Sequence, residues 1–421
     1  MVDHTYSQPV TLGRHFGFPD KSPWDDIFEQ LTPLGQFTWF REISADLDHG
    51  RVEVDGYCEM LMLGGYSYLG LNRHPAIKDS LNSAVSRFGT GTSGSRWLAG
   101  HTSLHRLLEQ KLAALHGTED SVVFSSGYTA NVSAVAALVN RDDLVVTDKC
   151  SHASVVDGCR FSNATFQRFR FKDLDHLRHI LSNGRTRFKR RLVVVDGVYS
   201  MSGDILDAPE VVKLCHEFDA ALMVDECHSH FVLGQHGHGI KEHFALPANA
   251  ITLEMGTLSK AIPANGGYIA ASRDLCNFLR RSARGFIYSG ATSAAMIASA
   301  IAAIDVFQAT GSTLIAQLQS NATVFRESLR DLGFEIEDKP VPIVPILVGD
   351  EHVAAAAATA CQQKGLFIHP VFPPVVAPGR SILRASIMAN HRPDDLRNAA
   401  SIIANSIKAA RKLANPSTAA G

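Results

Sequence analysis

Two stretches decide how this chain folds: Ala221-Leu222-Met223-Val224-Asp225 and Gly256-Thr257-Leu258-Ser259-Lys260. The first is a short apolar run that ends in a carboxylate, which is typical of a strand buried on both faces of a parallel sheet. A lysine amine can hold an aldehyde as a Schiff base, and a buried aspartate can keep a pyridine nitrogen protonated. Together Lys260 and Asp225 suggest an internal aldimine with pyridoxal phosphate. Because most lysines are simply exposed, this interpretation depends on the sequence around them.

Other short apolar runs repeat the pattern of the first stretch, and segments with helical spacing separate them. The runs cover residues 122–124, 144–146, 192–195 and 221–224. The spacing of Ile77, Leu81 and Val85 predicts one helix, and a second helical pattern ends at Gly117. Alternating strands and helices predict an α/β fold with a mostly parallel sheet and crossover helices on its faces.

Composition sets the class of the chain. Its 421 residues are 45% hydrophobic, enough for one large domain and a smaller one. With 40 basic and 42 acidic side chains the net charge is -2, which gives no reason to expect nucleic acid as a partner. The seven cysteines are an odd number without metal-ligand spacing. We therefore expect no metal, no fully paired disulfide framework and a cytoplasmic location.

Membrane attachment is not favoured by the sequence. The first thirty residues contain no apolar stretch of signal-peptide length, so we expect no export. Residues 293–307 are apolar but fall short of the roughly 20 residues that span a bilayer, and they predict a buried helix. The aromatic residues between Trp24 and Phe40 have loosely helical spacing. We expect them to pack in the core or at a dimer interface, with peripheral membrane binding as the alternative.

Polar residues follow the predicted strands, at the edge where open α/β sheets bind their ligands. Ser125-Ser126-Gly127-Tyr128 follows one strand and begins a helix, where free amides can cradle a phosphate. Thr257 and Ser259 could add hydroxyl donors to the same group. His152 follows another strand and could stack on a flat cofactor, although a structural histidine in a polar loop fits that position equally well.

In this order the motifs resemble those of the α-oxoamine synthases, a branch of the fold-type I pyridoxal-phosphate enzymes. The resemblance runs from about residue 61 to about residue 391 and is greatest to bacterial serine palmitoyltransferases. The matching stretches are Tyr68-Leu69-Gly70-Leu71, residues 89–96, Phe124-Ser125-Ser126-Gly127-Tyr128, Ser151-His152-Ala153-Ser154, residues 197–201, Asp225-Glu226-Cys227-His228-Ser229, residues 256–260 and Ile382-Leu383-Arg384.

The resemblance implies a role for each matching residue. Lys260 would form the aldimine, Asp225 would pair with the pyridine nitrogen, and His152 would stack on the ring. His228 and Ser200 would approach the phenolic oxygen. The phosphate end would comprise Ser126, Gly127, Tyr128, Thr257 and Ser259, with Ser289 reaching in from the partner subunit of a homodimer that shares its active sites. Arg384 would grip the amino-acid carboxylate with its planar fork, with Tyr66 and Ser67 beside the substrate.

The implied reaction is a decarboxylative condensation of an amino acid, serine favoured, with an acyl thioester to give an α-amino ketone. Lys260 and His152, with Asp225 and His228, are the expected catalytic residues. Glycine or alanine as the amino acid, and coenzyme A or acyl carrier protein as the thioester carrier, remain open. Another fold-type I lyase or aldolase and a silent partner subunit are the alternatives from other classes.

Several residues depart from the family pattern. Ser67 stands where asparagine is usual, Cys227 where alanine is usual, and Pro263 where glycine is usual. His230 and Phe231 are also atypical, and the usual Leu-Pro-Pro is missing after Ser289. Ser67 and Cys227 are expected near the cofactor, where simple packing is the favoured interpretation for Cys227. The other changes bear on the acyl-chain channel rather than on the chemistry at Lys260. The basic residues 185–191 could meet an anionic acyl carrier, but a solvated loop that guards the next strand is the favoured interpretation.

The expected organisation is an N-terminal arm, residues 1–60, a large cofactor-binding domain, residues 61–305, and a smaller α+β domain, residues 306–421, that supplies Arg384. The tail from Ala414 to Gly421 has the composition of a disordered end.

Overall fold

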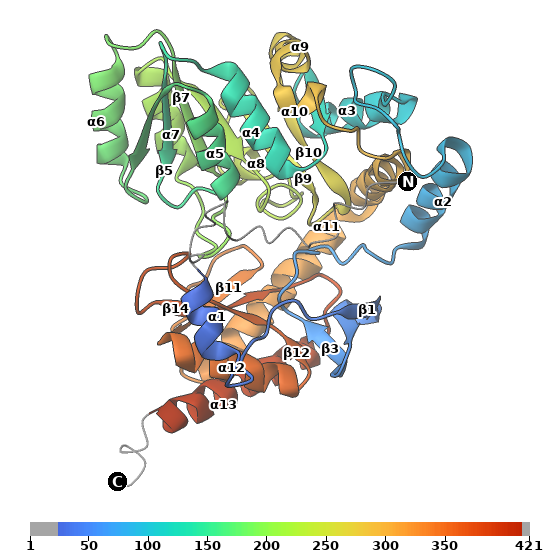
Figure 1. Ribbon diagram of the computed structural model, residues 1–421, viewed down its shortest axis with the longest axis vertical. Coiled ribbons are helices and arrows are strands. Elements are labelled where there is room, and N and C mark those ends of the chain that lie inside the picture. Colours follow the sequence, from blue (N-terminus) through green and yellow to red (C-terminus); the bar gives the residue numbers. More distant parts are fainter. Residues whose placement is uncertain (1–23, 415–421) are drawn as a thin grey trace, which may run out of the picture.

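The predicted apolar runs form the centre of a seven-stranded sheet, in the upper half of Figure 1. The computed structural model describes residues 24–414. The strands, in spatial order, are β4 (Asp120–Phe124), β10 (Pro263–Ala271), β9 (Leu253–Ser259), β8 (Ala221–Asp225), β7 (Arg191–Asp196), β5 (Leu144–Asp148) and β6 (Thr165–Phe169). Within this sheet β10 alone runs antiparallel to its neighbours, β4 and β9. The prediction of a mostly parallel sheet is confirmed.

The central strands are buried because helices cover both faces of the sheet. Side chains alternate along a strand, so Leu192 and Val194 pack on one face and Val193 and Val195 on the other. One face is covered by α4 (Gly127–Leu138), α5 (Ala153–Phe161), α9 (Arg273–Ser282) and α10 (Arg284–Ile287). The other face is covered by α2 (Pro75–Phe88), α3 (Ser103–His116), α6 (Leu174–Gly184), α7 (Ala208–Glu217), α8 (Ile240–His243) and part of α11 (Ala294–Asp331).

Both helices predicted from apolar spacing are present. α2 contains Ile77 as a buried residue, and α3 ends where Gly117 adopts φ 64°, a left-handed conformation that suits glycine. Sequence spacing therefore located these helices and one of their ends.

The second half of the molecule has a smaller core. A three-stranded antiparallel sheet contains β11 (Ile343–Gly349), β14 (Ser381–Ser386) and β13 (His369–Val371), and α12 (Glu351–Gln363) and α13 (Pro393–Ala414) pack with it. A second sheet joins β1 (Ile43–Asp46), β2 (Arg51–Val54) and β3 (Cys58–Met62) to β12 (Leu366–Phe367). A 3-10 turn, Asp48–Gly50, connects β1 to β2. Residues before 61 thus share a sheet and a core with residues beyond 306.

The helix α11 links the two halves (Figure 1). It begins at Ala294, as predicted for a buried helix, and continues to Asp331 through the proposed boundary at residue 305. By length and composition alone α11 could cross a membrane, but 61% of its apolar window is buried inside the protein. Burial of this kind is what a core helix shows. The three-part domain division stays a prediction.

The aromatic residues near the N-terminus pack together beside α1 (Asp25–Leu31). Phe28, Phe37 and Trp39 have ring centroids 5.2–5.5 Å apart, and Trp39 also lies 5.7 Å from Phe372. They are thus used for packing against the smaller half, while Phe40 stays 86% exposed. The predictions on the first 23 residues and on the tail after 414 lie outside the described residues.

Candidate active site

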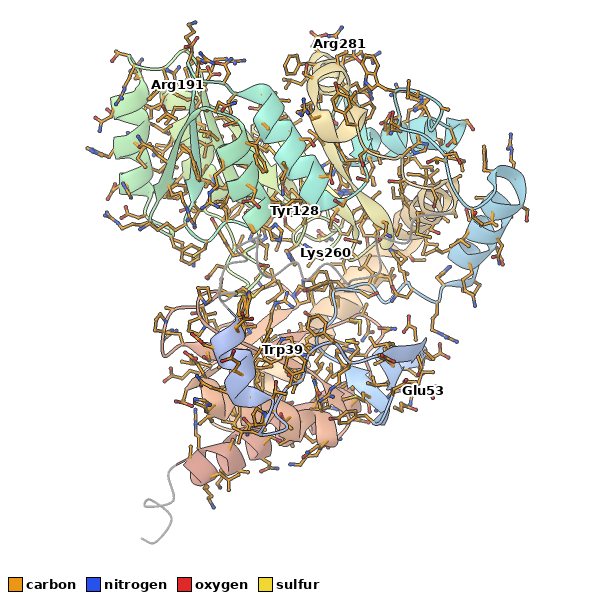
Figure 2. The ribbon with its side chains drawn as sticks, viewed as in Figure 1. Trp39, Glu53, Tyr128, Arg191, Lys260 and Arg281 are labelled. Atoms are coloured by element: carbon orange, nitrogen blue, oxygen red, sulfur yellow. The ribbon has the colours of Figure 1, made fainter. Side chains whose placement is uncertain are left out.

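The candidate site lies at the carboxyl ends of the parallel strands, where the two halves meet. Asp196 and Asp225 end β7 and β8 and lie side by side in register. Lys260 directly follows β9, and Figure 2 shows it between the two halves. Because parallel strands point the same way, residues far apart in the sequence converge at this edge.

Lys260 begins a chain of three polar groups. Its Nζ lies 2.7 Å from His228 Nε2, and His228 Nδ1 lies 2.7 Å from the Tyr68 hydroxyl. Burial lowers the pKa of His228 well below its ordinary value, and the cations of Lys260 and Arg384 add to the effect. His228 is therefore neutral at neutral pH. A neutral ring can accept a hydrogen bond at one nitrogen and donate at the other.

Asp225 is a buried carboxylate that accepts hydrogen bonds from two groups of the protein. Asn131 Nδ2 donates to it at 2.7 Å and the Cys227 amide at 3.0 Å. These bonds hold the carboxylate in place at the end of β8. Burial raises the pKa of the neighbouring Asp196 well above its ordinary value, and repulsion from Asp225 adds to this. Burial and this repulsion both favour the protonated form of Asp196.

His152 faces the cleft from the start of α5. Its Nδ1 lies 2.7 Å from the Ser154 hydroxyl, which in turn accepts a bond from Asn131. The Ser154 link fixes the ring beside Asp225. Loss of solvation lowers the pKa of His152, which favours the neutral ring. A flat neutral ring in this place suits stacking on an aromatic cofactor.

The predicted phosphate end assembles around the first turn of α4. The Ser126 side chain caps the helix by accepting from the Thr129 amide, which leaves the amides of residues 127 and 128 in the first turn available. A Cβ at Gly127 would come within 3.1 Å of Thr257 Oγ1. Thr257 Oγ1 lies 2.9 Å from Ser259 Oγ. The hydroxyl groups of Thr257 and Ser259 thus lie close to the start of α4, an arrangement that suits phosphate binding.

Two further residues of this predicted group have other contacts. Tyr128 donates its hydroxyl to Asp157 on α5, so its amide is the part available to a ligand. Ser289 Oγ lies 3.3 Å from Ser125 Oγ of the same chain. Ser289 therefore borders the phosphate end of its own subunit, and a contribution across a subunit interface stays a prediction.

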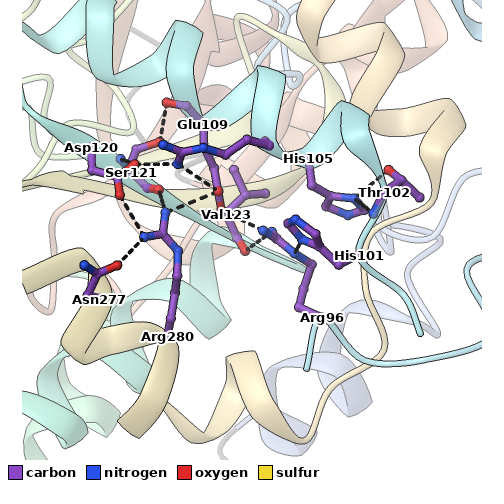
Figure 3. Close-up of polar contacts among 11 residues, drawn as sticks. Arg96, His101, Thr102, His105, Glu109, Asp120, Ser121, Val123, Asn277 and Arg280 are labelled. Carbon is purple, nitrogen blue, oxygen red and sulfur yellow. Dashed lines mark hydrogen bonds and ion pairs between the residues drawn. The ribbon is translucent and has the colours of Figure 1, made fainter. Parts of the chain in front are cut away.

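A buried charge cluster supports the strand that leads into α4 (Figure 3). Arg96 pairs with Glu109 at 2.9 Å, and the same carboxylate accepts the Val123 amide of β4. Arg280 bonds to Glu109 and to Asp120. Arg96 belongs to the segment whose Ser95 bridges Gly290, next to Ser289. The cluster therefore connects β4, which precedes Ser125, to the segment around Arg96, which pairs with the segment that contains Ser289.

Arg384 projects from β14 of the smaller half into the site. Its Nε donates to the Ser200 carbonyl at 2.6 Å and one terminal nitrogen to Ser386 at 2.7 Å. The other terminal nitrogen is buried without a partner. The ring of Tyr66 lies 5.3 Å from the guanidinium carbon and 5.9 Å from Lys260 Nζ. An unpaired buried guanidinium nitrogen beside an amine calls for an anionic ligand.

The other predicted substrate residue is less engaged. Ser67 lies between Tyr66 and Tyr68, and its hydroxyl donates to Asn72 at 3.0 Å. Cys227, an atypical residue, contacts the sulfur of Met255 at 3.4 Å, and burial raises the pKa of its thiol. A neutral thiol packed against methionine acts as a small apolar residue. Its role in packing agrees with the favoured interpretation from sequence.

His230 and the basic residues 185–191 lie away from the reaction centre. His230 stacks on His116 at 4.0 Å in the interior. Arg191 begins β7, at the opposite end from Asp196, and Figure 2 shows it far up the sheet from Lys260. Lys189, Arg190 and Arg191 pair with nearby aspartates. The cluster is placed to guard a strand rather than to meet a ligand at this site.

Two residues of the site were not given a role from sequence. Asn131 joins Asp225 to Ser154, and Asp196 bonds to the His152 amide. Asp196 follows an apolar run just as Asp225 does, so its pattern was available. A buried asparagine on α4 carries no such signal, because only the fold brings it to Asp225.

These features fit pyridoxal phosphate. A helix start with a glycine packed against Thr257 suits the phosphate. In the order of the sheet β9, which leads into Lys260, lies between β4, which leads into that helix, and β8, which ends in Asp225. The fold is that of the fold-type I pyridoxal-phosphate-dependent transferases.

Comparison with known proteins gives the family. Residues 59–403 match the model of the aminotransferase class I and II family. The chain is 37% identical to serine palmitoyltransferase of Bacteriovorax stolpii over 92% of its length and 93% of the relative's. It is 38% identical to 8-amino-7-oxononanoate synthase of Geobacter sulfurreducens over 89% and 95%. The chain belongs to the aminotransferase class I and II family, in its α-oxoamine synthase branch.

Solved structures agree. A Sphingomonas wittichii serine palmitoyltransferase matches with a TM-score of 0.88 at 27% identity, covering 94% of this chain and 99% of that one. A serine palmitoyltransferase structure with pyridoxal phosphate matches with a TM-score of 0.86 at 29% identity, covering 92% and 98%. The predicted family, fold and cofactor are confirmed. The roles of individual residues stay predictions.

Proposed function

We propose that this chain condenses L-serine with an acyl thioester, with loss of carbon dioxide, to give an α-amino ketone. The observation that carries the proposal is the unpartnered, buried nitrogen of Arg384, which faces the same Tyr66 ring as the amine of Lys260. An amine and a guanidinium close to one aromatic ring suit an α-amino acid. When bound, pyridoxal phosphate supplies an electron-accepting ring for the carbanion at the substrate α-carbon.

The protein's own groups would position the substrate and move its proton. Arg384 would hold the carboxylate, with its Nε fixed by Ser200. Lys260, once free as a neutral amine, would remove the α-proton, and the neutral ring of His228 at 2.7 Å would accept a bond from it. His152, held by Ser154, would cover the cofactor and orient the bond that breaks. Asp225, with Asn131 behind it, would keep one negative charge at the pyridine nitrogen.

The substrate assignment is less constrained than the chemistry. The relatives include both serine palmitoyltransferases and 8-amino-7-oxononanoate synthases at similar identity. Serine is favoured because of the motifs shared with serine palmitoyltransferases, although Ser67 replaces their asparagine. Glycine and alanine are the alternatives.

We further propose a cytoplasmic homodimer with shared active sites. Support comes from the segment that contains Trp97, a large apolar side chain that is 52% exposed. Ser95 of the same segment pairs with Gly290, next to Ser289. Among the described residues six cysteines are free, as suits a reducing compartment.

The test follows the visible spectrum of the cofactor-loaded enzyme as serine, glycine and alanine are titrated separately. An acyl thioester is then added, and free thiol, carbon dioxide and the product mass are measured. We expect a spectral change with serine, followed by thiol release that depends on it. A spectrum that no amino acid changes would refute the assignment. Turnover of serine without thiol release would favour the lyase or aldolase alternative.

A further inference from the structure

The turn formed by residues 200–204 of the larger half carries the Ser200 carbonyl that fixes Arg384. It packs closely on the smaller half. Gly203 has φ 66°, and a Cβ there would lie 3.1 Å from the Ile343 carbonyl oxygen at the start of β11. Since β11 pairs with β14, the turn lies directly against the sheet that contains Arg384.

One carboxylate connects this turn to both halves of the molecule. Asp204 Oδ1 accepts hydrogen bonds from Lys172 Nζ at 2.6 Å and from Lys339 Nζ at 2.8 Å. Lys172 lies in the larger half, between β6 and α6, whereas Lys339 leads into β11 of the smaller half. Although burial alone would raise the pKa of Asp204, the bonds from the two lysines hold it below its ordinary value. Asp204 is therefore ionised at neutral pH and bridges the halves.

The contact between Asp204 and Lys339 is shielded from solvent. Their side chains are 11% and 19% exposed, and Lys339 Nζ also donates to the Ser202 carbonyl of the same turn at 3.4 Å. The second carboxylate beside Lys339 belongs to Glu337 and is 79% exposed. Because salt screens a shielded pair less than a surface pair, the Asp204 contact is the one that holds the turn.

The position of the turn determines how Arg384 is aimed. The Ser200 carbonyl accepts from Arg384 Nε at 2.6 Å, and one terminal nitrogen of the same guanidinium is buried without a partner. Because the guanidinium is planar, its Nε bond sets the direction of the terminal nitrogens. A shift of the turn would therefore turn the unpartnered nitrogen away from the site.

We propose that Asp204 and Lys339 are positioning residues, which hold the 200–204 turn so that Arg384 is aimed at the substrate carboxylate. The inference rests on the proposed function, in which Arg384 binds that carboxylate. Asp204 acts through Lys339 and the Ser200 carbonyl. Breaking the pair frees the turn, so Arg384 binds the carboxylate less tightly while the amine end of the substrate, at Lys260, is unaffected.

The experiment titrates the cofactor-loaded enzyme with L-serine and, separately, with L-serinamide, whose neutral amide replaces the carboxylate, and follows the visible spectrum. Lys339→Met should raise the dissociation constant of serine about fivefold to twentyfold and that of serinamide less than about twofold. Lys172→Met leaves the contact between the halves intact, and Lys172 is 53% exposed, so serine binding should weaken less than about threefold. Lys111→Met is the matched control, because Lys111 pairs with Asp305 between α3 and α11, and neither constant should change.

A double-variant cycle separates positioning from direct contact with the substrate. In an Arg384→Lys background no planar fork remains to be aimed, so Lys339→Met should change serine binding less than about twofold. Lys339→Arg keeps a cation and should restore part of the affinity. Asp204→Asn removes the charge with little change of shape and should resemble Lys339→Met. Urea denaturation of each variant shows that the change in binding is not a general loss of stability.

Three outcomes would overturn the inference: unchanged serine affinity in Lys339→Met, equal losses for serine and serinamide, or full additivity with Arg384→Lys. The two proposals fail separately. If Lys339→Met loses serine affinity but the unmodified enzyme releases no thiol from any acyl thioester, the condensation is refuted and the positioning role stands. If condensation occurs and Lys339→Met keeps its serine affinity, only this inference is refuted.

Discussion

Lys260 Nζ and His228 Nε2 lie 2.7 Å apart, and the second nitrogen of the same ring contacts the Tyr68 hydroxyl. The lysine comes from the end of β9, the histidine follows β8, and the tyrosine precedes α2. The contact places a neutral imidazole beside the amine. The lysine can therefore take up a proton without repulsion from a positively charged histidine. The hydroxyl of Tyr68 fixes which way the imidazole faces.

Replacing Tyr68 by phenylalanine should lower kcat by about tenfold, since a buried hydrogen bond contributes on the order of 1 kcal/mol. The KM for the amino acid should change less than kcat, although the Tyr68 hydroxyl also interacts with Arg384. Steady-state kinetics measure both constants. Tyr66→Phe is the control, since the ring of Tyr66 lies against Lys260 and Arg384 and would be kept. Equal losses of kcat in the two variants would contradict the role of the Tyr68 hydroxyl.

Replacing Asp225 by asparagine should reduce turnover by at least about a hundredfold, because it removes the charge that favours a protonated pyridine nitrogen. Asp196→Asn is a matched control on the neighbouring strand. Burial raises the pKa of Asp196 and favours its protonated form, so an amide should replace it with a smaller loss, within about tenfold. Visible spectra of the loaded variants and single-turnover rates distinguish them. Similar losses at the two positions would show that the charge does not belong to Asp225.

Replacing Arg384 by lysine should raise the KM for the amino acid about 10- to 100-fold, because a point charge cannot replace a planar fork. The KM for the thioester should stay nearly constant. Arg380→Lys tests specificity, since Arg380 is exposed just before the same strand. If both variants raised the two Michaelis constants alike, Arg384 would not be the carboxylate-binding residue.

Much of the site was predictable because its residues follow apolar runs. Asp225 ends one such run, and Ser126 and His152 come shortly after two others, so the end of each strand placed them at one edge. The spacing of Ile77 and Leu81 predicted α2 in the same way. These signals are local, and a local pattern of burial is visible in a single sequence.

The remainder depends on contacts between distant segments. Asn131 reaches Asp225 only because α4 packs over β9 and β10, next to β8, and nothing in the sequence around Asn131 marks it. Likewise β12 joins the sheet of β3 across more than half of the chain, so the N-terminal strands belong to the smaller core. Pairing between distant strands is set by tertiary packing, which periodicity does not reveal.

The charge cluster in Figure 3 should be important for folding. Arg96→Met would leave Glu109, 1% exposed, with less charge compensation, so the free energy of unfolding should fall by about 3–5 kcal/mol. Urea denaturation measures the change. The control is Arg178→Met, which removes an exposed ion pair with Glu217 and should cost less than about 1 kcal/mol. The double variant Arg96→Met, Glu109→Gln should recover part of the loss. A loss in Arg96→Met no larger than in the control would contradict this view of the cluster.

Stability should also fall in mild acid because of buried neutral histidines. Burial lowers the pKa of His391 from 6.5 to about 4 and that of His369 to about 4. In the unfolded chain a histidine takes up a proton near pH 6.5, whereas in the folded protein it does so only near pH 4. The contribution of each is therefore complete above pH 6.5 and is lost progressively as the pH falls toward 4.

For His391 the loss between pH 6.5 and pH 5 should be about 2 kcal/mol, since one proton per molecule changes the free energy by about 1.4 kcal/mol per pH unit. Urea denaturation at the two pH values should show a smaller difference in His391→Gln than in the unmodified protein, although the variant is less stable at both. His179→Gln, an exposed position on α6, should leave the difference unchanged. If His391→Gln kept the full dependence on pH, His391 would already be protonated in the folded state at pH 5, and the charge would have to be stabilised by a partner such as Asp395.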